Sequence, residues 1–77
     1  MMKIEKLYCF MIIDKDGDEG ICGFKTDEGW MPMVGADLER MDSIEIIAKS
    51  IANSMNETIF LLEFTDRKEI KQIKPDN

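Results

Sequence analysis

The sequence has no histidine and only two cysteines, Cys9 and Cys22. Two cysteines without histidine are too few for a zinc site, and a serine or cysteine nucleophile would lack its usual general base. They are also too few for a disulfide scaffold, so we interpret them as buried, reduced thiols that act as small apolar residues. These absences predict a protein that is not an enzyme.

The chain also lacks the patterns that bind membranes, nucleotides or metals. No run approaches the roughly 20 apolar residues that span a bilayer, and no small-residue cleavage pattern marks a signal peptide. We therefore expect a cytoplasmic location and no membrane contact.

The glycines have neither Walker nor dinucleotide spacing. Residues 14–19 begin like a calcium loop, but Glu19 and Lys25 stand where an EF-hand needs glycine and a bidentate acid. We expect no cofactor and no metal.

Basic residues are scarce, and the net charge is −6. This balance argues against direct binding of nucleic acid, which needs clustered lysine and arginine. Between residues 27 and 45 only Arg40 is basic, whereas residues 67–74 are mainly basic. The acidic stretch is interpreted as a solvated face or as a surface for a basic partner. Its candidate residues are Asp27, Glu28, Asp37, Glu39, Asp42 and Glu45.

The longest apolar run, residues 7–13, has no alternation of apolar and polar side chains. A strand that faces water on one side alternates, so this run indicates a central strand with both faces covered. Asp16-Gly17 then predicts a two-residue hairpin turn that places Ile12 opposite Ile21. In that register one face of the sheet carries Leu7, Cys9, Met11, Ile13, Cys22 and Phe24, and the other carries Tyr8, Phe10, Ile12 and Ile21.

The rest of the chain predicts one helix and one further strand. Residues 30–35 are expected to form a compact apolar linker because Pro32 disfavours a central strand. Apolar residues at spacings of three and four predict a main helix that is capped by Asp42, or alternatively by Ser43, after a helical turn from Asp37. Asn53 and Asn56 are its stop signals. Residues 58–65 predict a strand, and residues 66–73 predict a short C-terminal helix, with a terminal edge strand as the alternative.

These elements predict a single small α+β domain over residues 1–77. Its β-β-α-β order, followed by a short C-terminal helix, gives a three-stranded antiparallel/mixed sheet of order 2-1-3. The main helix covers one sheet face. What covers the other face is left open between a second copy of the chain, another protein and a monomer in which residues 30–34 fold over it. The candidate interface residues are Tyr8, Phe10, Ile12, Trp30, Met31 and Met33.

The favoured hypothesis is a small, acidic, non-enzymatic protein-interaction module, homodimeric or bound to another protein. Its sharper form is an inhibitor, of immunity or anti-defence type, of a basic nucleic-acid-handling protein. The alternative is a small-ligand-binding protein with a pocket between Trp30, Met33 and the start of the main helix. Asp37, Asp42 and Glu45 weaken the alternative because they would repel an anionic ligand.

Overall fold

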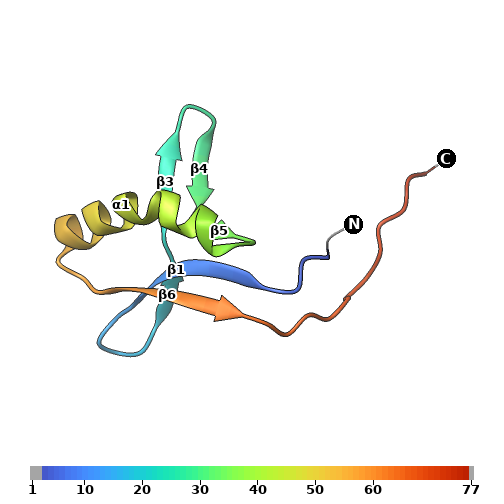
Figure 1. Ribbon diagram of the computed structural model, residues 1–77, viewed down its shortest axis with the longest axis horizontal. Coiled ribbons are helices and arrows are strands. Elements are labelled where there is room, and N and C mark those ends of the chain that lie inside the picture. Colours follow the sequence, from blue (N-terminus) through green and yellow to red (C-terminus); the bar gives the residue numbers. More distant parts are fainter. Residues whose placement is uncertain (1–2, 77) are drawn as a thin grey trace.

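The computed structural model describes residues 3–76. In chain order the elements are β1 (Leu7–Ile13), β2 (Glu19–Ile21), β3 (Gly23–Thr26), β4 (Gly29–Pro32), β5 (Val34–Gly35), α1 (Leu38–Met55) and β6 (Ile59–Phe64). The fold is α+β: one helix lies over an antiparallel sheet, and a separate hairpin of β3 and β4 projects from that sheet (Figure 1).

β1 is the central strand of the main sheet, as its unbroken apolar sequence predicts. β6 runs antiparallel along one edge of β1, from Leu7 opposite Phe64 to Ile12 opposite Ile59. The other edge is shared by β2 and β5, which pair with opposite ends of β1. The predicted order 2-1-3 is therefore found as β2-β1-β6, and the sheet is antiparallel throughout. β5 is an additional strand that the sequence did not predict.

The turn between β1 and β2 has three loop residues and not the predicted two. The Asp14 N–H donates to the Asp18 carbonyl (2.9 Å), and the loop ends at Gly17, whose φ of +87° favours glycine. The Asp14 carboxylate accepts hydrogen bonds from the backbone N–H groups of Asp16 (2.8 Å) and Asp18 (3.0 Å). These bonds stabilise the longer turn, so the predicted two-residue turn is wrong.

The longer turn shifts the register of the second strand by one residue. Ile21 lies opposite Met11 and not opposite Ile12. The next residue, Cys22, donates its backbone N–H to the carbonyl of Phe10 (2.9 Å). A one-residue shift moves each side chain to the opposite face of a sheet. Ile21 and Cys22 are therefore on the opposite faces from those that the sequence predicts.

Residues 22–33 leave the main sheet as a hairpin that the sequence did not predict. β3 and β4 pair along their whole length, and the Met33 N–H closes the base of the hairpin by donating to the Cys22 carbonyl (2.8 Å). The hairpin extends past α1 (Figure 1). The predicted linker over residues 30–35 is therefore wrong. Pro32 is tolerated because it ends a strand that has only one neighbour.

α1 is one continuous helix that begins at Leu38. Asp37 is its N-cap, since the carboxylate accepts a hydrogen bond from the Arg40 N–H at 2.7 Å. The prediction of a main helix from Asp42 after a separate turn is therefore wrong. The helix ends at the predicted stop signal Asn56, where a left-handed backbone (φ 52°) directs the N–H to a carbonyl of the last turn.

Residues 65–76 form neither a helix nor a strand, so the predicted C-terminal helix is wrong. They run away from the sheet (Figure 1), and Ile70 and Ile73 are almost fully exposed. Two isoleucines give too narrow an apolar edge to dock a helix, and a short helix that is not packed is marginal in water. The terminal edge strand, the other expectation, does not form either.

Candidate functional site

One face of the main sheet is packed beneath α1. The core is built by side chains from β1, α1 and the base of the hairpin: Tyr8, Phe10, Cys22, Met33, Met41, Ile44 and Ala48. β5 approaches the helix so closely that a Cβ on Gly35 would lie 2.9 Å from both Arg40 Cγ and Met41 Sδ. This contact fixes α1 over the even-numbered residues of β1.

The position of α1 reverses the prediction of which face stays open. Tyr8 and Phe10, expected at an interface, are buried beneath α1, and Ile12 packs against the same core. Both faces of β1 are apolar, so its sequence contains no signal for the side on which the helix lies. The three residues from β1 are therefore core residues of the monomer.

The opposite face of the sheet, which we call the open face, has no helix over it. Within residues 3–76, α1 is the only helix, and it lies on the other side of the sheet (Figure 1). The strand register places nine apolar side chains from four strands on the open face: Leu7, Cys9, Met11, Ile13, Ile21, Val34, Phe60, Leu62 and Phe64. Glu19 lies opposite Ile13 at one end.

The open face has a buried centre and an exposed apolar rim. Cys9 and Met11 are buried, since larger side chains on the flanking strands surround them. The rim is about half exposed: Leu7 46%, Ile21 56%, Phe60 41% and Phe64 49%. Four such side chains form an apolar patch of roughly 300–400 Å², comparable to the largest patch on a typical monomer, which is often functional.

The two cysteines are free thiols on opposite faces of the sheet. Cys9 belongs to the open face and Cys22 to the core beneath α1. The prediction that they share a face is therefore wrong, because the one-residue shift of the second strand moves Cys22 to the opposite face. Burial raises the pKa of the Cys9 thiol, with a smaller contribution from Glu19, and burial also raises the pKa of Cys22. A raised pKa disfavours the thiolate, which is the nucleophilic form.

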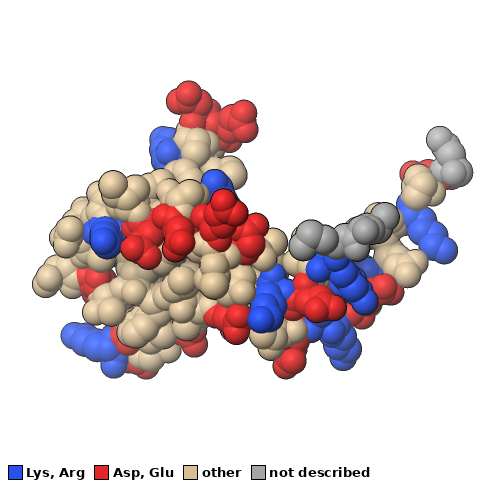
Figure 2. All heavy atoms as spheres, viewed as in Figure 1, with Lys and Arg blue, Asp and Glu red and all other residues tan. Residues whose placement is uncertain are grey.

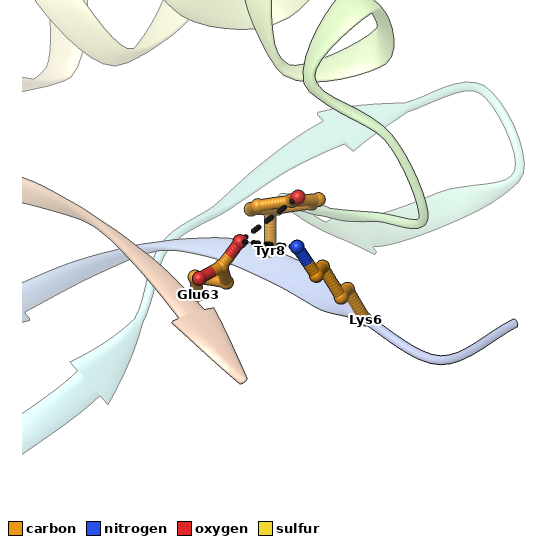
Figure 3. A network of polar contacts seen from close by, with 3 residues as sticks. All are labelled: Lys6, Tyr8 and Glu63. Carbon is orange, nitrogen blue, oxygen red and sulfur yellow. Dashed lines mark hydrogen bonds and ion pairs between the residues drawn. The ribbon is translucent and has the colours of Figure 1, made fainter. Parts of the chain in front are cut away.

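Tyr8, Glu63 and Lys6 form a polar network at the end of the sheet (Figure 3). The Tyr8 hydroxyl donates to Glu63 Oε1 (3.1 Å), and Lys6 Nζ lies 3.6 Å from the same oxygen. Burial raises the pKa of Tyr8, and its hydrogen bond to Glu63 and the charge of that carboxylate raise it further. The network ties β1 to β6 on the helix-covered face.

The three predicted interface residues beyond β1 are not brought together. Trp30 is 73% exposed on β4 and Met31 is also exposed, whereas Met33 is completely buried. A completely buried side chain cannot line an open pocket. The expected ligand pocket between Trp30 and Met33 is therefore not formed by these two side chains.

The predicted acidic residues lie on the same side of the sheet as α1. Asp27 and Glu28 occupy the turn of the β3–β4 hairpin, and the other four lie at the start of α1 and along its first half. Figure 2 shows acidic side chains at the end of this hairpin and along the helix. Residues 7–64 contain 12 acidic and 4 basic side chains, a net charge of −8. The acidic surface and the open face are thus separate surfaces.

Two further kinds of site are not found in the described part of the chain. Residues 3–76 contain no group of three or more side chains placed to hold a metal ion. The Asp14 carboxylate of the calcium-like loop instead accepts two backbone hydrogen bonds within its own turn. Among these residues, no helix is both long enough and apolar enough to cross a bilayer.

Comparisons of the chain with models of protein families, with curated proteins and with solved structures gave no match.

Proposed function

We propose that this protein is a small, non-enzymatic protein-interaction module that binds another protein through the open face. One observation carries the proposal: nine apolar side chains form this face, and four of them remain about half exposed with no element of residues 3–76 over them. An apolar patch of this size on a monomer is often functional. Both thiols have a raised pKa, which fits a binding role better than a catalytic one.

Covering the open face would supply a large part of the binding free energy. At about 25 cal/mol per Å², a patch of roughly 300–400 Å² contributes roughly 8–10 kcal/mol before the cost of association is subtracted. That cost is of similar size. Affinity would therefore depend on how closely the partner's apolar surface fits around the rim residues Leu7, Ile21, Phe60 and Phe64.

A matched pair of substitutions tests this proposal. Ile21→Lys places a charge on the open face, whereas Ile46→Lys places the same charge on the exposed side of α1. We expect a bound partner, recovered with the wild-type chain, to be lost with Ile21→Lys and retained with Ile46→Lys. Equal recovery with both variants, at unchanged melting temperatures, would refute binding through the open face.

The acidic surface supports a second candidate function, inhibition of a basic nucleic-acid-handling protein. Of the six predicted acidic residues, only Glu45 is in an ion pair within the described chain, with Lys49 at 3.9 Å. Uncompensated carboxylates favour a basic partner and make its binding sensitive to salt. We expect Asp42→Lys to weaken such binding and Ile21→Lys to leave it unchanged. Binding that is independent of salt would exclude this candidate.

A further inference from the structure

β6 is an edge strand whose outer backbone groups have no partner in the described chain. The backbone N–H and C=O of Phe10 form hydrogen bonds at the edge of β1 that β2 and β5 share. Successive residues of a strand direct these groups to alternate edges, so the residues before and after Phe10 direct their N–H and C=O groups to β6. The residues of β6 that face them are Phe60, Leu62 and Phe64. It follows that Ile59, Leu61 and Glu63 direct their N–H and C=O groups outward.

This edge lacks most of the features that normally prevent strands from pairing. Edge strands are protected by proline, lysine, bulges, short length or a covering element. β6 has six residues without lysine or proline, and it pairs with β1 in an uninterrupted register. Its one charged residue, Glu63, lies at the end of the strand beside Lys6 and Tyr8. The middle of the edge, at Leu61, is apolar and exposed.

We propose that a second copy of this chain adds to the β6 edge, giving a two-fold dimer with one continuous antiparallel sheet. Centring the pair on Leu61 places Leu61 opposite Leu61 and Ile59 opposite Glu63 of the other copy, so each outward N–H meets an outward C=O. The two exposed leucines then cover each other. The inference is independent of the open face, because it uses the backbone edge and the helix-covered side of β6.

A basic side chain lies beside the edge at the point that Glu63 of a second copy would reach. Lys49 lines one hollow of about 270 Å³ between α1 and β6 together with Ile59, Leu61 and Glu45, and Glu45 lies 3.9 Å from it. In the proposed register Glu63 of one copy faces Ile59 of the other, so Lys49 would be shared between that Glu63 and Glu45 of its own chain. The contact is self-complementary, since it occurs twice about the two-fold axis.

The dimer would join the two open faces on one side of the continuous sheet. A two-fold axis perpendicular to the sheet keeps both copies of α1 on the other side. Strand pairing with a few side chains covers less than the roughly 800 Å² per partner of a standard interface, so we expect micromolar affinity.

Sedimentation equilibrium of the full chain at high micromolar concentration tests the proposal. We expect a dimer for the wild type and a monomer for Leu61→Pro, because proline removes an outward N–H that β1 does not use. Leu61→Ala keeps that N–H and is expected to remain at least partly dimeric. A wild-type chain that stays monomeric would overturn the proposal.

The open face provides the control that separates this proposal from the proposed function. Ile21→Lys changes the open face at the opposite edge of the sheet, so we expect it to dimerise like the wild type. Dissociation by Ile21→Lys with retention of the dimer by Leu61→Pro would assign the dimer to the open face and overturn pairing through β6. Loss of partner binding in Ile21→Lys tests only the proposed binding through the open face, and it does not bear on pairing through β6.

Hydrogen exchange serves if Leu61→Pro does not fold. In the wild type, the amide protons of Ile59, Leu61 and Glu63 should exchange more slowly as protein concentration rises. Exchange at these amides that is independent of concentration would also refute the edge contact.

Discussion

Tyr8 and Glu63 are 55 positions apart in sequence, yet the tyrosine hydroxyl donates a hydrogen bond of 3.1 Å to the glutamate carboxylate. The two residues are directly opposite in the β1–β6 pair. Their contact holds the first and last strands together on the side of the sheet that α1 covers. Lys6 lies beside the same carboxylate oxygen, which keeps a charged group compatible with the edge of an apolar core.

This contact predicts that Tyr8 ionises at a higher pH than an unperturbed tyrosine. Its pKa is raised by burial first and by Glu63 second, above the ordinary value of 10.0. Because the folded-state pKa is the higher one, the stabilisation is present below the unfolded pKa and is lost as pH rises through the folded value. Tyr8 is the only tyrosine, so ultraviolet absorbance of tyrosinate reports it alone.

We expect the absorbance midpoint of the folded chain to lie above that of the denatured chain. Glu63→Gln should lower the midpoint without returning it fully to the ordinary value, since burial remains. Glu57→Gln, outside the network, is the control and should leave it unchanged. Equal midpoints for folded and denatured protein would contradict the hydrogen-bonded arrangement.

Gly35→Ala is expected to destabilise the protein. The added Cβ would lie 2.9 Å from atoms of both Arg40 and Met41, and the buried Met41 has little room to move. Overpacking of this kind typically costs about 1–3 kcal/mol in the free energy of unfolding. Gly20→Ala is the matched control, because its Cβ would have no neighbour within 4 Å. Chemical denaturation of both variants measures the difference, and equal midpoints would refute the close contact of β5 with α1.

The sequence predicted the central strand, the helix and β6 because each depends on local periodicity or on an unbroken apolar run. It did not predict the register of β2, because this depends on hydrogen bonds from Asp16 and Asp18 to the carboxylate of Asp14. Asp16-Gly17 is a strong signal for a two-residue turn, and the side chain two residues earlier overrides it.

The open face was predicted on the wrong side for a related reason. β1 is apolar on both faces, and β6 places its two phenylalanines away from the helix. Side-chain hydrophobicity therefore does not identify the covered face. Gly35 would have been the better signal, since it lies opposite Tyr8 and leaves space on the helix side for Arg40 and Met41.

Truncation of methionines should separate core residues from surface residues. Met33 and Met41 are the two largest fully buried side chains, whereas Met55 is exposed at the end of α1. Met33→Ala and Met41→Ala should each cost about 2–5 kcal/mol in the free energy of unfolding, because each leaves a cavity. Met55→Ala should change it by less than about 0.5 kcal/mol. A small effect at Met33 would mean that the base of the hairpin does not belong to the core.

Removal of residues 66–77 should have little effect on stability. Ile70 and Ile73 are almost fully exposed, and Arg67 reaches the rest of the chain through an exposed hydrogen bond of 3.3 Å to the carbonyl of Ile4. We expect the free energy of unfolding to change by less than about 0.5 kcal/mol, as for other exposed segments. Thermal or chemical denaturation of the shortened chain provides the measurement.

The same truncation tests whether the tail covers the open face. If Ile70 and Ile73 packed on that face in solution, their removal would expose Phe60 and Phe64 further and lower the melting temperature. It would also increase binding of a dye that fluoresces on apolar surfaces. An unchanged melting temperature and unchanged dye binding are expected, because the tail runs away from the sheet. A marked loss of stability would assign the open face to the chain's own C-terminal segment and remove the basis for an external partner.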